Sequence, residues 1–222
     1  MKHSTRAYEQ LRQEIVAWEL PPGTHLSEIR IAERLGVSRT PLREALQRLA
    51  ADNLVKVVPG RGAFVTDISL QDVRNLFQLR EALDTYAVRL CARSSRRGEF
   101  AALERDFTRQ HAELDTAPDA VRLDGYYELT ARLDQRIDQV AGNPYLAAAA
   151  LPLRDQLRRL RRIARRTPGR IARSAVEHAH ICGAVAEGDE ARAADLTATH
   201  INNSLRNILS AMTDGFGDAN DS

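Results

Sequence analysis

The 222-residue chain has little cysteine, few aromatic residues and no long hydrophobic run. Its two cysteines, Cys91 and Cys182, exclude a disulfide framework and stand in no metal-binding spacing, which favours buried thiols. Aromatic residues make up only 5% of the chain, which favours helices over sheets. No apolar run approaches the roughly 18 residues of a membrane span, and the first residues lack the apolar stretch of a signal peptide. The sequence therefore predicts a cytoplasmic protein that contacts no membrane.

Neither sign of charge predominates, because the chain has a net charge of only +2. Residues 1–66 contain ten Lys and Arg against seven Asp and Glu, so the positive excess lies in the N-terminal third. Hydrophobic residues make up 43% and charged residues 28%, an ordinary globular composition that excludes intrinsic disorder. The length predicts one or two domains.

Hydrophobic spacing in the N-terminal third predicts three helices. Apolar residues recur at steps of three and four from Thr5 to Trp18 and stop before two prolines. A short second helix follows Ser27 as its N-cap and ends at Gly36, and a third begins after Ser38. Two helices joined by a glycine-containing turn form a helix-turn-helix.

The exposed face of the third helix carries polar residues near its N-terminus, where a recognition helix contacts DNA: Ser38, Arg39, Thr40 and Arg43. The planar fork of arginine binds guanine or clamps a phosphate. Two β-rich runs, 54–58 and 63–66, flank a glycine-rich hairpin tip that carries Arg61, and they predict a wing. The alternative, a helical surface with ordinary solvated charges, explains this order of elements less well.

The stretch from PPGTHL to GRGAFV strongly resembles the DNA-binding domain of GntR-family bacterial transcription regulators, most specifically in LGVSRTPLREAL and GRGAFV. The resemblance implies that Ser38, Arg39, Thr40 and Arg43 contact the operator and that Gly60, Arg61 and Gly62 reach the minor groove. Many members have an arginine where this sequence has Ile29. Either Arg30 or Arg34 is then expected to take over the phosphate contact.

Beyond Thr66 the sequence shows helical spacing only. It predicts six helices, which end near residues 93, 114, 140, 166, 187 and 212, with a kink at Pro152 in the fourth. The expected fold is mainly α: a winged helix-turn-helix over residues 1–66 and an all-α six-helix bundle over residues 67–222. Nine arginines between Arg154 and Arg173 predict a solvated face, or else a contact with flanking DNA or an acidic partner.

Two histidines of the bundle are expected to face one another. His178 lies ten residues before Gly188 and His200 twelve after it, which puts them at nearly the same height on a helical hairpin. One inward histidine is most simply a hydrogen-bonded core residue. Two at matched height make a metal or anion site about as good an interpretation.

The segments AGNPYL and EHAHICGAVAEGDEARAADLTATHI resemble the FCD ligand-binding domain of the FadR-like branch, in its VanR-like subgroup. Many such domains bind a divalent metal through an Asp and a His on one helix and two further His residues. The first two positions fall at Thr130 and Asp134 here, so Asp134, His178 and His200 remain as ligands for Zn²⁺, Ni²⁺ or Mn²⁺. The competing interpretation is that an acidic metabolite meets the histidines and Arg80 directly.

Family members often place an arginine at the position of Arg80 to face the effector carboxylate. An intrahelical salt bridge with Asp84 is the equally weighted alternative. The effector set implied by the resemblance is Arg80, Thr130, Asp134, His178 and His200. The sequence thus predicts a homodimeric, DNA-binding transcription repressor that responds to a small organic acid and is not an enzyme; the alternative is a metalloenzyme using Asp134, His178 and His200.

Overall fold

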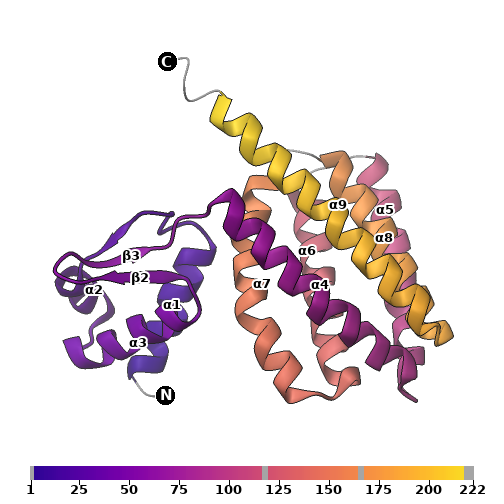
Figure 1. Ribbon diagram of the computed structural model, residues 1–222, viewed down its shortest axis with the longest axis horizontal. Helices are drawn as coiled ribbons and strands as arrows, with labels where there is room; N and C mark the ends of the chain where they lie inside the picture. Colours follow the sequence, from indigo (N-terminus) through magenta and orange to yellow (C-terminus); the bar gives the residue numbers. More distant parts are fainter. Residues whose placement is uncertain (1–2, 117–119, 165–167, 218–222) are drawn as a thin grey trace. The chain divides into compact units, whose positions relative to one another are not determined.

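The computed structural model describes residues 3–116, 120–164 and 168–217, and the chain divides into two compact units. The first unit comprises Met1–Ser69 together with Pro152–Arg162, and the second comprises Leu70–Leu151 and Ile163–Ser222. The predicted mainly helical fold is confirmed (Figure 1).

The first unit is a winged helix-turn-helix. Its three helices are α1 (His3–Val16), α2 (Glu28–Leu35) and α3 (Arg39–Ala51). The antiparallel sheet has the order β1-β3-β2 and consists of β1 (His25–Leu26), β2 (Val55–Val58) and β3 (Gly62–Val65). Fully buried side chains from the helices and the sheet form its core, among them Leu11, Ile15, Leu42, Leu49 and Val65. Strand β1 was not predicted, because two residues are too short for an alternating pattern.

The turn between α2 and α3 follows from local sequence. Gly36 has φ 63°, a left-handed conformation that glycine adopts without a Cβ clash, and the amide of Val37 closes the turn on the carbonyl of Ala32 (3.0 Å). Ser38 has the extended backbone of an N-cap, although its side chain makes no capping hydrogen bond. The predicted helix-turn-helix is therefore present, with the N-terminus of α3 at the surface.

The middle of α7 (Pro144–Ala164) belongs to the first unit and is held there by polar contacts. Arg12 pairs with Asp155 through two hydrogen bonds, Nε to Oδ2 (2.5 Å) and Nη2 to Oδ1 (2.8 Å). Arg159 is completely buried and donates to the carbonyl (2.6 Å) and hydroxyl (3.0 Å) oxygens of Thr66. Burial lowers the pKa of Arg159 to about 10, which still leaves it charged at neutral pH. The prediction of a solvated arginine face is wrong at this residue, because Thr66, far along the chain, accepts two of its hydrogen bonds.

The second unit is the predicted bundle. Besides the ends of α7 it contains five helices: α4 (Leu70–Arg93), α5 (Phe100–Thr116), α6 (Ala120–Ala141), α8 (Pro168–Glu187) and α9 (Glu190–Gly217). A short 3-10 turn, η1 (Arg97–Glu99), precedes α5. Helix α4 packs along α9 and α5 along α8, while Gly188, with φ 83°, joins α8 and α9 into a hairpin (Figure 1).

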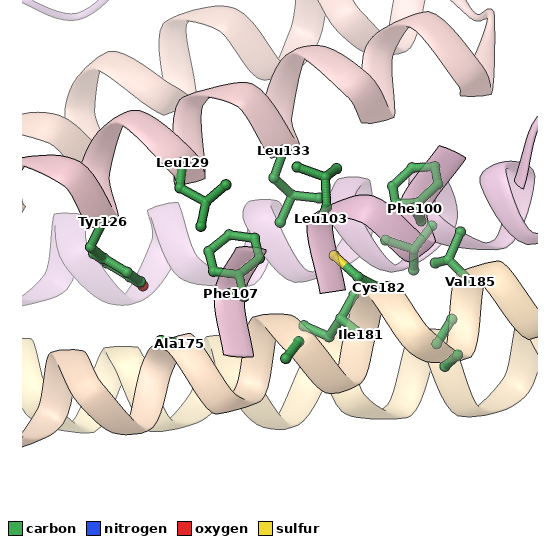
Figure 2. Close-up of a cluster of buried hydrophobic side chains, with 14 of the residues drawn as sticks. Phe100, Leu103, Phe107, Tyr126, Leu129, Leu133, Ala175, Ile181, Cys182 and Val185 are labelled. Carbon is green, nitrogen blue, oxygen red and sulfur yellow. The ribbon is translucent and has the colours of Figure 1, made fainter. Parts of the chain in front are cut away.

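The core of this unit lies where α5, α6 and α8 meet (Figure 2). Its side chains include Phe100 and Phe107 from α5, Leu129 and Leu133 from α6, and Cys182 from α8. Cys182 and Cys91 are buried free thiols, as predicted, and burial raises the pKa of Cys91 to about 12. No helix in the described part of the chain is long and apolar enough to cross a membrane.

Candidate functional site

The surface that the sequence predicts to recognise DNA lies on the N-terminal half of α3. The side chains of Arg39 and Arg43, four residues apart on one face, are 61% and 62% exposed. Glu28 on α2 lies beside both, with its Oε2 2.9 Å from Nε of Arg43 and 3.8 Å from Nε of Arg39. Ser38 and Thr40 are exposed next to them. A carboxylate that gathers two exposed guanidinium groups pre-orients them for an acceptor.

The wing places one arginine at its tip. Gly60, Arg61 and Gly62 are all exposed, and the amide of Arg61 donates to the carbonyl of Val58 (3.0 Å) to close the turn. Gly60 and Gly62 have φ 73° and 96°, and a Cβ on Gly62 would lie 2.9 Å from Nε2 of His25. The tip therefore needs glycine at these positions to present Arg61.

Arg30 and Arg34, the two candidates for the phosphate contact, have different environments. Both nitrogens at the tip of Arg34 donate to the carboxylate of Glu14, at 2.8 and 2.6 Å, and Glu14 is itself buried in α1. Arg30 is exposed, and it lines an open pocket together with His25 and Ser27. Arg34 is engaged in an internal ion pair, so the geometry favours Arg30 for a phosphate contact.

In the second unit the two predicted histidines meet. The ring centroids of His178 and His200 lie 4.3 Å apart, and both residues are buried. His178 Nδ1 is 3.2 Å from the hydroxyl of Tyr126, whose ring packs against it. His200 Nδ1 lies 2.6 Å from Glu177 Oε2. Because an ionised carboxylate only accepts hydrogen bonds, Nδ1 of His200 carries the proton.

The residues present do not fit the metal that the resemblance implies. Thr130 is buried, but its hydroxyl donates to the carbonyl of Tyr126 within α6 (2.8 Å). Among the residues that the structure describes, no three His, Cys, Asp or Glu side chains are grouped so that they could hold a metal ion. Asp134 is therefore not brought into a ligand group with His178 and His200. A structural or catalytic zinc site needs at least three protein ligands.

Arg80 forms the intrahelical salt bridge with Asp84 that was one of its two predicted roles. Its Nε donates to Oδ2 of Asp84 (3.1 Å), one helical turn along α4, and its guanidinium carbon lies 5.6 Å from the ring centroid of Phe77.

The residues that sequence reasoning missed are Arg170 and Glu177, which lie seven residues apart on one face of α8. Arg170 Nη2 donates to Glu177 Oε2 (2.8 Å). Their spacing was a usable signal, because residues i and i+7 share a helix face.

Comparison with known proteins places the chain in a family. Residues 3–65 match the model described as bacterial regulatory proteins, gntR family, and residues 75–203 match the FCD domain. The HTH-type transcriptional repressor RspR of Escherichia coli (strain K12) is 34% identical over 134 residues, or 60% of this chain. That alignment spans only 57% of the length of RspR.

Two further similarities extend over more of the chain. An uncharacterised HTH-type transcriptional regulator of Streptomyces ambofaciens is 30% identical over 195 residues, which cover 87% of this chain and 80% of that protein. The solved structure of E. coli McbR/YncC shares the fold, with a TM-score of 0.74 and 18% identity over 95% of this chain and 98% of that one. Because the FCD match covers more than half of the chain and the gntR match lies on the winged unit, the chain belongs to the gntR family of bacterial regulatory proteins and carries an FCD domain.

Proposed function

We propose that this protein is a transcription repressor that binds operator DNA as a homodimer through its winged unit and responds to a small carboxylate in its helical unit. The observation that carries the proposal is the exposed pair Arg39 and Arg43 at the start of α3. Family members and relatives are transcription regulators rather than enzymes, which argues against the metalloenzyme alternative.

DNA recognition is proposed to follow the geometry of the winged unit. The N-terminus of α3 enters the major groove, where Arg39 and Arg43 meet base edges or phosphates beside Ser38 and Thr40. Arg30 meets the phosphate backbone, while Arg61 approaches the minor groove at the tip of the wing. Phosphate contacts supply affinity that any sequence shares, and base contacts supply the selectivity.

Dimerisation and repression rest on different support. One winged module reads too few base pairs for genomic selectivity, whereas a two-fold dimer reads two half-sites. The printed name of the relative RspR describes a repressor, and repression is proposed here on that similarity.

The effector is proposed to bind near His178 and His200, where buried polar side chains gather inside an otherwise apolar bundle. Such a group of buried donors suits an anion better than an apolar ligand. The effector regulates DNA binding only if it binds two arrangements of the protein with different affinity.

Arg61→Ala provides a test of the wing. Its removal is expected to weaken binding to specific and nonspecific duplexes alike and to reduce the salt slope of the affinity by about one unit. Fluorescence anisotropy of labelled duplexes over a range of salt concentrations measures both. A loss confined to one sequence would show instead that the wing reads bases, and affinity that is independent of salt in the wild type would contradict the DNA-binding proposal itself.

A further inference from the structure

Arg170, in the first turn of α8, is a buried cation whose hydrogen bonds are only partly satisfied. Its side chain is 8% exposed, and Nη2 donates to Oε2 of Glu177 (2.8 Å) and to Oγ of Ser204 (3.2 Å). Among the described residues, Nε and Nη1 of Arg170 have no hydrogen-bond acceptor although both atoms are buried. Arginine keeps its donors in a protein, and buried donors are almost always paired. We therefore expect these two nitrogens to bind an acceptor.

The side chains around Arg170 already bind one carboxylate, that of Glu177. Oε2 of Glu177 accepts from Arg170 Nη2 and from His200 Nδ1, and Oε1 accepts from Nδ2 of Asn203 (2.9 Å). The two oxygens of one carboxylate thus use donors from three side chains on α8 and α9. Glu177 thus links Arg170 to His200, whose ring packs against that of His178.

The charges of this cluster differ from those of a metal site. A divalent ion would supply the positive charge that attracts an anion, but the residues present do not fit one. Glu177 balances the charge of Arg170 and occupies one side of its guanidinium group. The hydrogens of the remaining donors, Nε and Nη1, leave the guanidinium group in different directions, because Cδ lies between them, so each can meet a separate acceptor. A carboxylate oxygen at either one gains a charge-assisted hydrogen bond, which is stronger than a hydrogen bond between neutral groups.

We propose that Arg170, rather than a bound metal or Arg80, anchors the carboxylate of the effector through one of its two open donors, Nε or Nη1. The inference rests on the proposed effector role of the second unit and adds its anchoring residue and its independence of metal. Arg80 differs from Arg170 because its Nε donates to Asp84 and none of its atoms is among the buried donors without an acceptor in the described part of the chain. The ligand class is a small organic acid whose carboxylate lies beside that of Glu177, with the histidine pair next to it.

The test uses the full chain after dialysis against a chelator, with sodium acetate, succinate and citrate as probes and sodium chloride at matched ionic strength as the blank. At least one carboxylate is expected to raise the melting temperature and to shift the imidazole resonances of His178 and His200. Arg170→Lys keeps the charge beside Glu177 but removes both open guanidinium donors, Nε and Nη1, so its affinity for that probe is expected to fall by roughly tenfold to a hundredfold. Arg80→Lys is the matched control and should bind like the wild type.

The outcomes separate the inference from the proposed function. Equal binding by Arg170→Lys and the wild type, or binding that appears only after Zn²⁺ or Mn²⁺ is added, overturns the anchor while the effector role stands. No response of the wild type to any probe, with or without metal, overturns both the anchor and the effector role and leaves DNA binding untouched. If Arg170→Lys does not fold, Arg170→Gln serves in its place, since its amide still donates to Glu177; wild-type affinity in that variant overturns the anchor.

Discussion

Replacing Arg39 and Arg43 together with alanine is expected to weaken operator binding on the order of a hundredfold or more, because each bidentate arginine–guanine contact contributes about 1–3 kcal/mol. Both side chains are largely exposed, so the melting temperature should stay within about a degree or two of the wild type. The affinities are measured by anisotropy with a cognate duplex and a scrambled one.

A matched control removes the same charge elsewhere. Arg109 and Arg192 are exposed arginines of the second unit, with side chains 69% and 53% accessible. The double variant Arg109→Ala/Arg192→Ala changes the net charge equally and is expected to bind the cognate duplex like the wild type. Unaltered cognate binding by Arg39→Ala/Arg43→Ala would exclude this face of α3 as the recognition surface.

The second large effect concerns stability. Asp155→Ala is expected to lower the free energy of unfolding of the first unit by about 3–5 kcal/mol, because it leaves a mostly buried guanidinium without its main acceptor. Arg12 is only 17% exposed and Asp155 3%, and two hydrogen bonds join them. Differential scanning calorimetry measures the loss.

Glu9 supplies the control for this pair. It is the second partner of Arg12, 3.1 Å away, but its side chain is 45% exposed. Glu9→Ala should therefore cost less than about 1 kcal/mol, as exposed ion pairs generally do. A cost for Asp155→Ala no greater than that for Glu9→Ala would show that burial of this pair does not stabilise the unit.

Local signals were sufficient to predict the helix-turn-helix. Gly36 ends α2 in a left-handed conformation, Ser38 precedes α3, and the glycines around Arg61 form the wing, all within a few residues of the signal itself. The facing histidines were also predictable, because the distance of each from Gly188 follows from the rise of a helix. The structure adds the centroid separation of 4.3 Å.

What sequence reasoning missed depends on partners far along the chain. Arg159 lies in an arginine-rich run that is typical of a solvated surface, and it is buried because Thr66, 93 residues earlier, supplies two acceptors. Arg170 lies in the same run and is buried against Glu177 and Ser204. The run also includes Arg165 and Arg166, which lie outside the described residues. A charge pattern alone does not show which arginines find buried acceptors.

The central claim is that α3 and the wing read a specific DNA sequence. Selection from a pool of random duplexes with the purified protein, repeated with Arg39→Ala/Arg43→Ala, tests it most directly. We expect the wild type to enrich a site of two related half-sites and to bind it at least about a thousandfold more tightly than random DNA, and the double variant to enrich none. Failure of the wild type to enrich any sequence, or enrichment of the same site by the double variant, would contradict the account.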